Sequence, residues 1–286
     1  MASGSKLENE VDNSINPTDK DVSTADKADI GIIGGTGVYD PQLLEDTSMV
    51  EINTPYGSPS DTITLGTFES KHVAILPRHG FGHSIPPHAI NFKANIWALK
   101  KLGVKRVIAT AAVGSLKEEY RAGDVVIPDQ FIDMSKTVHT FFDGPKVCHV
   151  SMADPFCSEL RELLIRTTME LEIPMKATGT YLKIDGPQFS TRAASHMYKQ
   201  FADIIGMTAV PEAILCREQE ICFAAIATVT DYDCWKVTEA PVSIESIKQV
   251  MAKNLDNTKK ILQLAVKNVT EERACACKQA LKGAEA

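Results

Sequence analysis

Residues 30–40 read IGIIGGTGVYD, an apolar run that ends in a cluster of glycines. The run predicts a buried β-strand over residues 30–34. Glycines after such a strand let the backbone turn tightly and approach another group closely, and this group is often a phosphate. The stretch therefore predicts a core strand with a ligand-facing turn at its end.

Two well-known nucleotide-binding patterns do not match this turn. The dinucleotide pattern G-x-G-x-x-G needs a third glycine and a long helix, whereas VYD and Pro41 follow here and leave room for only a short helix around residues 41–46. A P-loop would end in Gly-Lys-Ser/Thr, and that lysine is missing. What remains is a turn that offers backbone N–H groups and the Thr36 hydroxyl to a small anion, and a purely structural turn fits equally well.

Downstream of the turn, strand patterns alternate with helical ones, which is typical of an α/β fold with a central mixed β-sheet flanked by helices. No repeat or linker interrupts residues 30–266, so we expect a single domain over residues 29–268, a disordered extension over 1–28 and a C-terminal tail over 269–286. The predicted strands are residues 30–34, 62–66, 72–76, 105–110, 124–127, 177–184, 203–206 and 222–229, and the predicted helices are residues 89–101, 156–171, 191–201, 211–218 and 243–266.

Composition narrows the possible classes of protein. The chain has 286 residues, 44% of them hydrophobic, and a net charge of −7, which argues against a broad nucleic-acid-binding surface. No apolar run reaches the ~18 residues of a membrane-spanning helix, and no secretory leader opens the chain. We therefore expect a soluble cytoplasmic protein that binds neither nucleic acid nor membrane, with the nucleus as a further location.

The seven cysteines are mostly solitary, which is typical of reduced thiols and not of a disulfide framework. Only Cys275 and Cys277 are closely spaced. An incidental pair on the tail is the simpler interpretation, and a redox or metal-binding role is the alternative. We therefore assign no metal ligand.

A second candidate for binding an anion is Arg78-His79, directly after the predicted strand 72–76. Arginine can hold two phosphate oxygens at once, and histidine can donate a hydrogen bond to a third. A surface turn with a salt-bridged arginine is the alternative. The position favours a site, because ligands of open α/β sheets gather at the carboxyl ends of the strands.

Three further stretches follow predicted strands. Residues 109–115 (ATAAVGS) have side chains small enough for a ligand to lie against the backbone, and residues 186–190 (GPQFS) present an aromatic ring in a turn. Residues 230–235 (TDYDCW) place Asp231 and Asp233 at the end of a strand, where a buried carboxylate is costly unless it is paired or takes part in chemistry. Asp233 fits a carboxylate satisfied by backbone N–H groups equally well, and Asp231 is the better candidate for chemistry.

Taken in order, these motifs resemble the 5'-methylthioadenosine phosphorylases of the trimeric purine nucleoside phosphorylase superfamily. The resemblance implies a nucleoside phosphorylase-like fold, a homotrimer with sites at subunit interfaces, and phosphorolysis of methylthioadenosine to adenine and 5-methylthioribose 1-phosphate. Inorganic phosphate would be a co-substrate, with no cofactor. The motifs are GGTG (34–37), RHG (78–80), NIWAL (95–99), GSL (114–116), DQFID (129–133), GP (186–187), MT (207–208), VPE (210–212) and TDYDCW (230–235).

The resemblance also implies a role for each candidate residue. Asp231, as the general acid, would protonate N7 of the departing adenine, and an aspartate at this place favours a 6-aminopurine over a 6-oxopurine. The other implied roles are phosphate binding for Thr36, Arg78, His79, Thr208 and the backbone around Ala112, purine binding for Phe189, Asp231 and Asp233, ribose binding for Met207, and apolar walls around the 5' group for Val237 and Val242.

The sequence departs from the family pattern at several places. Ala111 and Ala209 stand where the family has threonine, Gln188 replaces an arginine, and the stretch from Gly144 to Cys148 is short. These departures leave two alternatives open: a broader purine nucleoside phosphorylase acting on adenosine or inosine, and a non-catalytic protein that binds purine nucleosides.

Overall fold

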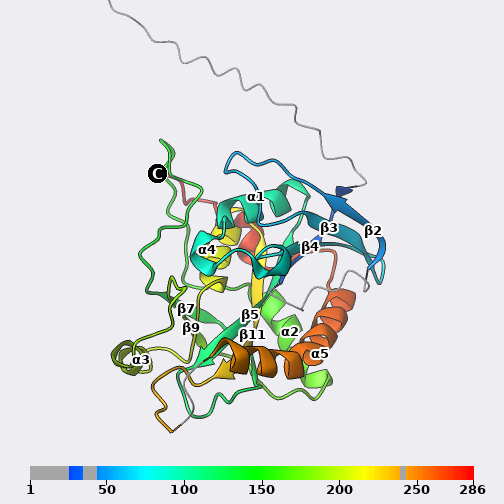
Figure 1. Ribbon diagram of the computed structural model, residues 1–286. Helices are drawn as coiled ribbons and strands as arrows, with labels where there is room; N and C mark the ends of the chain where they lie inside the picture. The colour runs from blue at the N-terminus through cyan, green and yellow to red at the C-terminus, as the bar shows by residue number, and fades with distance from the viewer. Residues whose placement is uncertain (1–25, 35–43, 239–242) are drawn as a thin grey trace, which may run out of the picture.

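Strand β5 (Arg106–Ser115) is the central strand of the fold in the computed structural model, which describes residues 26–34, 44–238 and 243–286 (Figure 1). Its sequence RVIATAAVGS is buried along almost its whole length. Strands β1 (Ile30–Gly34) and β11 (Cys222–Asp231) run parallel to it, one on each side. Continuous small and β-branched runs of this kind are typical of strands that are covered on both faces.

The described strands form one mixed eleven-stranded sheet, which confirms the predicted fold class. On one side of β5, the parallel pair β1–β4 is extended by two antiparallel strands, β3 and β2. On the other side, β11 pairs with β6, and β6 pairs with β8. β10 pairs with the last residues of β5 on the same side as β1, and β9 and β7 follow it. These strands are β2 (Glu45–Val50), β3 (Ile63–Phe68), β4 (Lys71–Pro77), β6 (Val125–Val126), β7 (Gln130–Asp133), β8 (Met175–Lys176), β9 (Thr180–Lys183) and β10 (Ile204–Gly206).

Helices cover both faces of the sheet (Figure 1). On one face, α1 (Phe92–Lys101) and α4 (Ala209–Glu218) bury a cluster that includes Leu99, Val210 and Phe223. On the other face, α2 (Ser158–Glu170) and α5 (Ile244–Asn268) bury a cluster that includes Leu164 and Ile261. The short helix α3 (Arg192–Tyr198) lies beyond β7 and β9.

Three strands were not predicted: β2, β7 and the two-residue β8, which ends just before the predicted strand 177–184. β2 is polar and exposed along most of its length and lies at the edge of the sheet, so its strand conformation comes from pairing with β3 and not from an apolar pattern. β7 is half exposed and, among the described strands, pairs with β9 alone. The short helix expected around residues 41–46 falls partly outside the described residues, and Glu45 and Asp46 belong to β2.

Several predicted boundaries also shift. Residues 109–115, expected to follow the central strand, continue it. Helix α1 begins at Phe92 and not at residue 89, because the Asn91 side chain accepts a hydrogen bond from the Ala94 N–H (3.1 Å) and caps the helix there.

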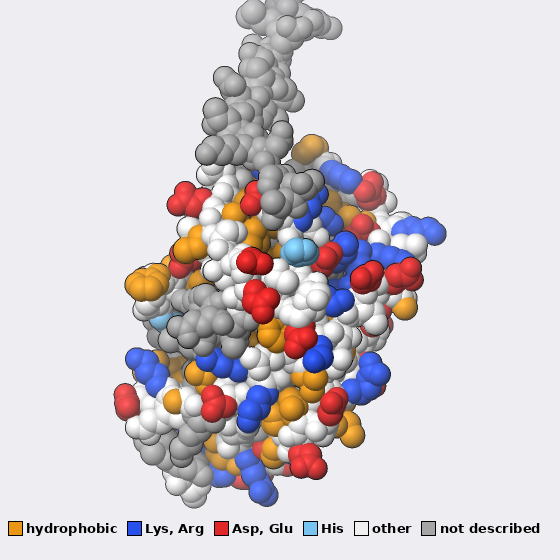
Figure 2. Space-filling model, turned by 90° about the vertical axis from the view of Figure 1, so that its right-hand side faces the viewer, with side chains coloured by type: hydrophobic (Ala, Val, Ile, Leu, Met, Phe, Trp, Pro, Cys, Tyr) orange, Lys and Arg blue, Asp and Glu red, His pale blue; other side chains and the backbone are white. Residues whose placement is uncertain are grey.

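The C-terminal segment, residues 269–286, folds back onto the domain. Val269 and Cys277 are buried, and a β-bridge joins Glu285 to Cys148, so that the C-terminus lies beside the loop of residues 134–149 (Figure 1). Of the predicted N-terminal extension, residues 1–25 lie outside the described residues. Over the parts of the chain that the structure describes, no helix has the length and apolar character needed to cross a bilayer. Acidic and basic side chains are interspersed over the face shown in Figure 2.

Candidate active site

One edge of β5 is open along part of its length. β1 pairs with β5 as far as Ala109, and β10 pairs with it again from Gly114, so among the described residues no strand pairs with residues 110–113 on this side. The opposite edge is covered by β11. Backbone N–H and C=O groups on the open edge need other partners, which makes this stretch suited to a ligand.

Arg78 partly fills this gap. It follows β4, its backbone N–H donates to the Gly34 carbonyl (3.0 Å), and its Nη1 donates to the Thr110 carbonyl (2.8 Å). Nε and Nη2 donate to the two carboxylate oxygens of Glu212, with Nη2–Oε2 at 2.8 Å. A guanidinium has five N–H donors, so one N–H on each of Nη1 and Nη2 remains for a ligand. Arg78 thereby links the ends of β1 and β4, the open edge of β5 and helix α4.

The Arg78–Glu212 pair is almost completely buried, each residue being 1% exposed. Burial raises the pKa of Glu212, and the charge of Arg78 opposes that rise. A buried ion pair contributes little net stability but fixes geometry, because either partner alone would be an uncompensated buried charge. In the sequence Glu212 stands out only as part of the VPE motif, with no role of its own, and the structure places it as the residue that orients Arg78.

Two more of the predicted phosphate residues lie near this arginine. Thr208 directly precedes α4, four residues before Glu212, so it stands at the helix N-terminus, where free N–H groups favour an anion. Ala112 is an exposed residue in the otherwise buried part of β5. Alternate residues of a strand direct their backbone groups to the same edge, so the Ala112 N–H faces the open edge with the Thr110 carbonyl.

Thr36 lies outside the described residues. The chain leads toward it from Gly34, whose carbonyl accepts the Arg78 backbone N–H. The phosphate role of Thr36 stays a prediction. The side chain of Thr110, which the sequence did not single out, is buried, and its hydroxyl has no hydrogen-bond partner among the described residues.

His79 is held in one orientation beside Arg78. Its Nδ1 lies 2.9 Å from the Ile85 carbonyl, and its ring stacks on His83 with centroids 4.1 Å apart. Burial, and then the charge of Arg78, lower the pKa of His79 from 6.5 to about 4. The ring is therefore neutral near pH 7, and because a carbonyl can only accept, its proton is on Nδ1. Nε2 then presents a lone pair, so in this tautomer it can accept a hydrogen bond from a ligand but cannot donate one.

This geometry predicts a pH effect on stability. Between the unfolded pKa of 6.5 and the folded pKa of about 4, only the unfolded chain takes up this proton. The contribution of His79 is therefore complete above pH 6.5 and is lost as the pH falls toward 4. As the pH is lowered from 6.5 to about 4, we expect the Tm of His79→Gln to fall less steeply than the Tm of the parent chain. His88→Gln, at an exposed site, is the control and should retain the parent slope; identical slopes for all three chains would contradict the assignment.

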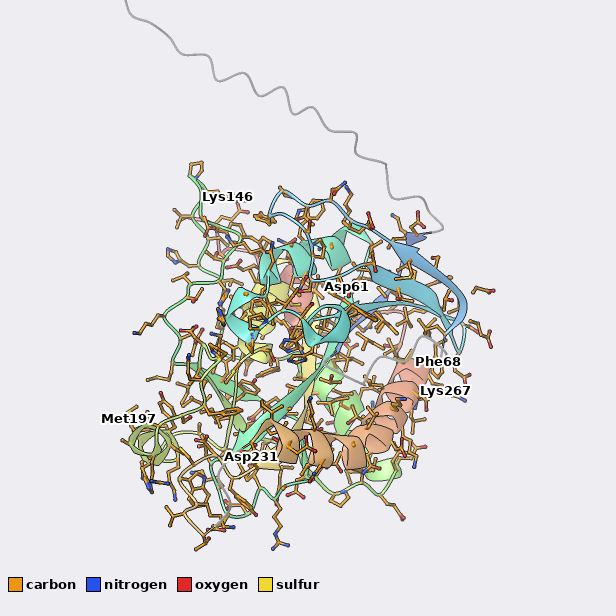
Figure 3. The ribbon with its side chains drawn as sticks, viewed as in Figure 1. Asp61, Phe68, Lys146, Met197, Asp231 and Lys267 are labelled. Carbon is orange, nitrogen blue, oxygen red and sulfur yellow. The ribbon has the colours of Figure 1, made fainter. Side chains whose placement is uncertain are left out.

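Asp231 reaches the site through an irregularity in β11. Val229 pairs with Val113 but Asp231 pairs with Gly114, so Thr230 is an extra residue in β11. Such a bulge turns the following side chain to the other face of a sheet. A Cβ atom on Gly114 would lie only 3.1 Å from Asp231 Oδ1, so glycine at this position lets the carboxylate pack closely against β5. Figure 3 shows Asp231 at the end of the sheet far from Lys146.

Both carboxyl groups of this strand end are enclosed and hydrogen-bonded. Asp231 accepts from the Thr230 hydroxyl and from the Asp233 backbone N–H, both at 2.7 Å, and Asp233 accepts from the Ser195 hydroxyl. Burial raises the pKa of Asp231 and of Asp233, and these hydrogen bonds oppose the rise. Asp233 is thus satisfied by Ser195 of α3, while Asp231 is buried against Gly114 of β5.

The remaining candidates have differing structural support. The Met207 side chain packs closely on Gly186: a Cβ atom on Gly186 would overlap the Met207 sulfur. Met207 therefore lies against the turn that carries Phe189. Phe189 is 42% exposed, leaving much of its side chain open to a ligand. Val237 is exposed, and Val242 lies outside the described residues.

The candidate residues contact β5 at two separate places. Arg78 contacts β5 at Thr110, and Asp231 contacts it at Gly114. Four residues of a strand span about 13 Å. The exposed Ala112 lies midway. An arginine and a carboxyl group thus lie at two ends of a stretch of small side chains, over which an elongated ligand can lie.

Comparison with known proteins is consistent with this arrangement. The family model described as "Phosphorylase superfamily" matches residues 29–267. S-methyl-5'-thioadenosine phosphorylase of Saccharolobus solfataricus is 54% identical over 265 residues, 91% of this chain and 97% of that protein. The protein of the same name from Nitrosopumilus maritimus is 52% identical, over 90% of this chain and 98% of its own length.

Solved structures agree. Methylthioadenosine phosphorylase from an Antarctic soil metagenomic library has a TM-score of 0.87 at 48% identity, covering 91% of this chain and 93% of its own. Methylthioadenosine phosphorylase from Schistosoma mansoni, in complex with adenine, has a TM-score of 0.84 at 37% identity, covering 90% and 97%. The resemblance seen in the sequence motifs is confirmed: this chain belongs to the phosphorylase superfamily, among the relatives known as S-methyl-5'-thioadenosine phosphorylases.

Proposed function

We propose that this chain is a pentosyltransferase that cleaves 5'-methylthioadenosine with inorganic phosphate, giving adenine and 5-methylthioribose 1-phosphate. The observation that carries the proposal is that β5 contacts two buried groups four residues apart, the Arg78 guanidinium at Thr110 and the Asp231 carboxyl group at Gly114. Phosphate and the purine need these two kinds of partner, and the ribose would lie between them.

Phosphate binds at the Arg78 end in this proposal. The two N–H groups that Arg78 keeps, the Ala112 backbone N–H, and Thr36 and Thr208 would surround its oxygens, and Nε2 of His79 would accept a hydrogen bond from its protonated oxygen. Glu212 and the Thr110 carbonyl hold the guanidinium in place, so the phosphate is positioned for attack on the anomeric carbon. Because His79 is neutral, it adds no positive charge that would weaken the nucleophile.

The purine leaves at the Asp231 end. The bond to N9 lengthens as phosphate attacks, so the ribose gains oxocarbenium character and the base gains negative charge. A carboxyl group that burial keeps protonated to higher pH than an exposed one can donate its proton to N7. Asp231 is that acid in the proposal, Asp233 contacts the same edge of the base, Phe189 packs on the purine and Met207 lies under the ribose.

We extend the proposal to a homotrimer in which a neighbouring subunit completes the 5' pocket together with Val237 and Val242. The resemblance to the family supports this assembly. A second support is exposed apolar surface: Phe81 is 84% exposed only two residues after His79, and Val138, in the loop of residues 134–149, is 83% exposed. Exposed apolar groups beside a site favour a protein–protein contact.

Phe81→Lys tests the assembly. The parent chain should elute as a particle of about 94 kDa, three times the 31.2 kDa chain, and the variant should dissociate and lose turnover. Met169→Lys is the matched control, because Met169 is an exposed methionine on α2 and should leave the mass unchanged. Light scattering after gel filtration reads the mass, and a parent chain that is monomeric at the assay concentration would contradict the trimer.

The substrate is tested by comparing methylthioadenosine, adenosine and inosine at saturating phosphate. We expect methylthioadenosine to have the highest kcat/KM and inosine the lowest, because Asp231 can accept from a 6-amino group but not pair with a 6-oxo group. Adenosine is the second candidate, since a Schistosoma mansoni structural relative is described as an adenosine/methylthioadenosine phosphorylase. A preference for inosine would contradict the assignment of the base.

A further inference from the structure

Four cysteines from distant parts of the chain converge at the end of β11 opposite to Asp231. Cys157 directly precedes α2, Cys222 begins β11, and Cys275 and Cys277 belong to the C-terminal segment. Their four sulfur atoms all lie within 4.8 Å of one another, and the Cys222 and Cys275 sulfurs are 3.3 Å apart. All four are free thiols, three of them buried and Cys275 partly buried. We call this group the thiol cluster.

We propose that the thiol cluster is a structural metal site for a soft divalent cation, and for zinc in particular. Zinc in structural sites takes four thiolate ligands in a tetrahedron at about 2.3 Å, which puts neighbouring sulfurs about 3.8 Å apart. With no two sulfurs more than 4.8 Å apart and those of Cys222 and Cys275 at 3.3 Å, shifts of about 1 Å bring these distances to the tetrahedral value. Magnesium and calcium require oxygen ligands, so the donor set excludes them.

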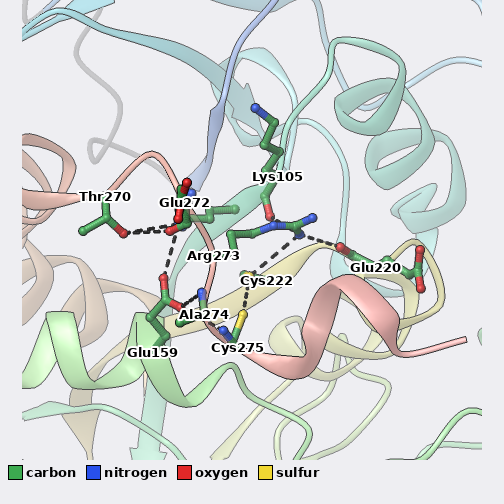
Figure 4. A network of polar contacts seen from close by, with 10 residues as sticks. Lys105, Glu159, Glu220, Cys222, Thr270, Glu272, Arg273, Ala274 and Cys275 are labelled. Carbon is green, nitrogen blue, oxygen red and sulfur yellow. Dashed lines mark hydrogen bonds and ion pairs between the residues drawn. The ribbon is translucent and has the colours of Figure 1, made fainter. Parts of the chain in front are cut away.

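The local backbone lets both cysteines of the C-x-C pair face the same centre. Cys275 is extended (φ −71°, ψ 161°) and a single turn of 3-10 helix, Ala276–Gln279, begins directly after it. Glu159 of α2 holds this bend, because its Oε2 accepts hydrogen bonds from the backbone N–H groups of Ala274 (2.8 Å) and Cys275 (3.0 Å) (Figure 4). The thiols are thus positioned by contacts that do not use their sulfurs.

Positive charge surrounds the cluster where a tetrathiolate centre needs it. Four thiolates and one divalent cation carry a net charge of −2. Nη1 of Arg217 lies 3.7 Å from the Cys277 sulfur, and Nη1 of Arg273 lies 4.0 Å from the Cys222 sulfur. Arg273 is itself held by the carbonyls of Glu220 (2.8 Å) and Lys105 (3.3 Å), as Figure 4 shows. Outer contacts that orient and balance the ligands are a general feature of metal sites.

The position of the cluster indicates a structural and not a catalytic role. β11 carries Cys222 at its first residue and Asp231 at its last, so the metal would lie about 30 Å from the carboxyl end of the site. The metal would link the C-terminal segment to α2 and to the sheet. Metal binding to a site that exists only in the folded chain stabilises the fold.

The test uses the full-length, tag-free chain, expressed with added zinc and purified with a non-thiol reductant. Elemental analysis after dialysis should give about one zinc per chain, and cobalt exchanged into the site should show the sulfur-to-cobalt charge-transfer and visible bands of a tetrahedral thiolate centre. Cys275→Ser/Cys277→Ser should lower the bound zinc at least tenfold. Cys148→Ser, outside the cluster, is the matched control and should keep it.

A second measurement covers the case in which the double variant fails to fold. Removing zinc from the parent chain with a chelator should lower Tm, open Arg273 and Lys278 to trypsin, and be reversed by adding zinc. Two results would overturn the proposal: zinc far below one per chain with all four thiols reactive after unfolding, or peptide mapping without reductant that recovers the four cysteines as disulfides. Neither result bears on phosphorolysis, so this site and the proposed function are tested independently.

Discussion

Asp231→Asn is expected to lower kcat for adenine release from methylthioadenosine by about 10²- to 10⁴-fold, the range that general acid catalysis contributes. Asparagine keeps the size and hydrogen-bonding shape of aspartate but cannot deliver a proton to N7. Because burial raises the pKa of Asp231, the parent enzyme stays protonated at this group to higher pH than an exposed carboxyl group would. Its kcat should therefore fall as pH rises through that raised pKa, and this limb should vanish in the variant.

The control is Asp154→Asn, an exposed aspartate near the start of α2, which should retain the parent rate and pH profile. Asparagine at position 231 should also reduce the preference for a 6-aminopurine over a 6-oxopurine, because its amide can donate to an oxo group. If Asp231→Asn kept the parent kcat and its alkaline limb, Asp231 would not be the acid.

Arg78→Ala is expected to raise the KM for phosphate and to lower kcat/KM for phosphate by about 10³-fold or more, since it removes a bidentate donor pair from the anion. It should also lower the free energy of unfolding by about 3–5 kcal/mol, because Glu212 would become an unpaired buried charge. Steady-state kinetics with varied phosphate and urea unfolding would measure the two effects.

A double variant separates binding from stability. In Arg78→Met/Glu212→Met both charges are replaced by apolar groups, so most of the lost stability should return while phosphate turnover stays low. Glu212→Gln keeps the arginine and one acceptor oxygen, and should raise the KM for phosphate more than it lowers kcat. If the double variant regained the parent kcat/KM for phosphate, Arg78 would not bind the phosphate.

Much of this site could be predicted because its residues lie where strands end. Arg78 and Asp231 each follow a buried apolar run, and the carboxyl ends of parallel strands meet at one edge, so their proximity could be expected from the amino-acid sequence alone. The buried strands β1, β4 and β11 were predictable for the same reason: a continuous apolar run is a local signal.

What escaped prediction depends on long-range pairing. The exposed strand β2 exists because β3 offers it hydrogen bonds, and the bulge that turns Asp231 toward Gly114 follows from the register of β11 on β5. The role of Glu212 is equally non-local, because nothing near it in sequence indicates the buried arginine 134 residues away.

The cysteines show the same limit. The C-x-C pair was visible in the sequence, and an incidental pair was the simpler interpretation. Cys157 and Cys222 join it only because α2 and β11 begin side by side, and the chain returns to that place after α5. A closely spaced pair plus solitary cysteines at element starts is the signal that could have raised the metal alternative.

The central claim is that phosphate is the nucleophile that releases adenine. The most direct measurement is adenine release from methylthioadenosine with and without inorganic phosphate, with the sugar product identified by phosphorus NMR. Adenine should appear only with phosphate, in equal amount to 5-methylthioribose 1-phosphate. Adenine release at the same rate without phosphate, or binding of methylthioadenosine with no release at all, would contradict it.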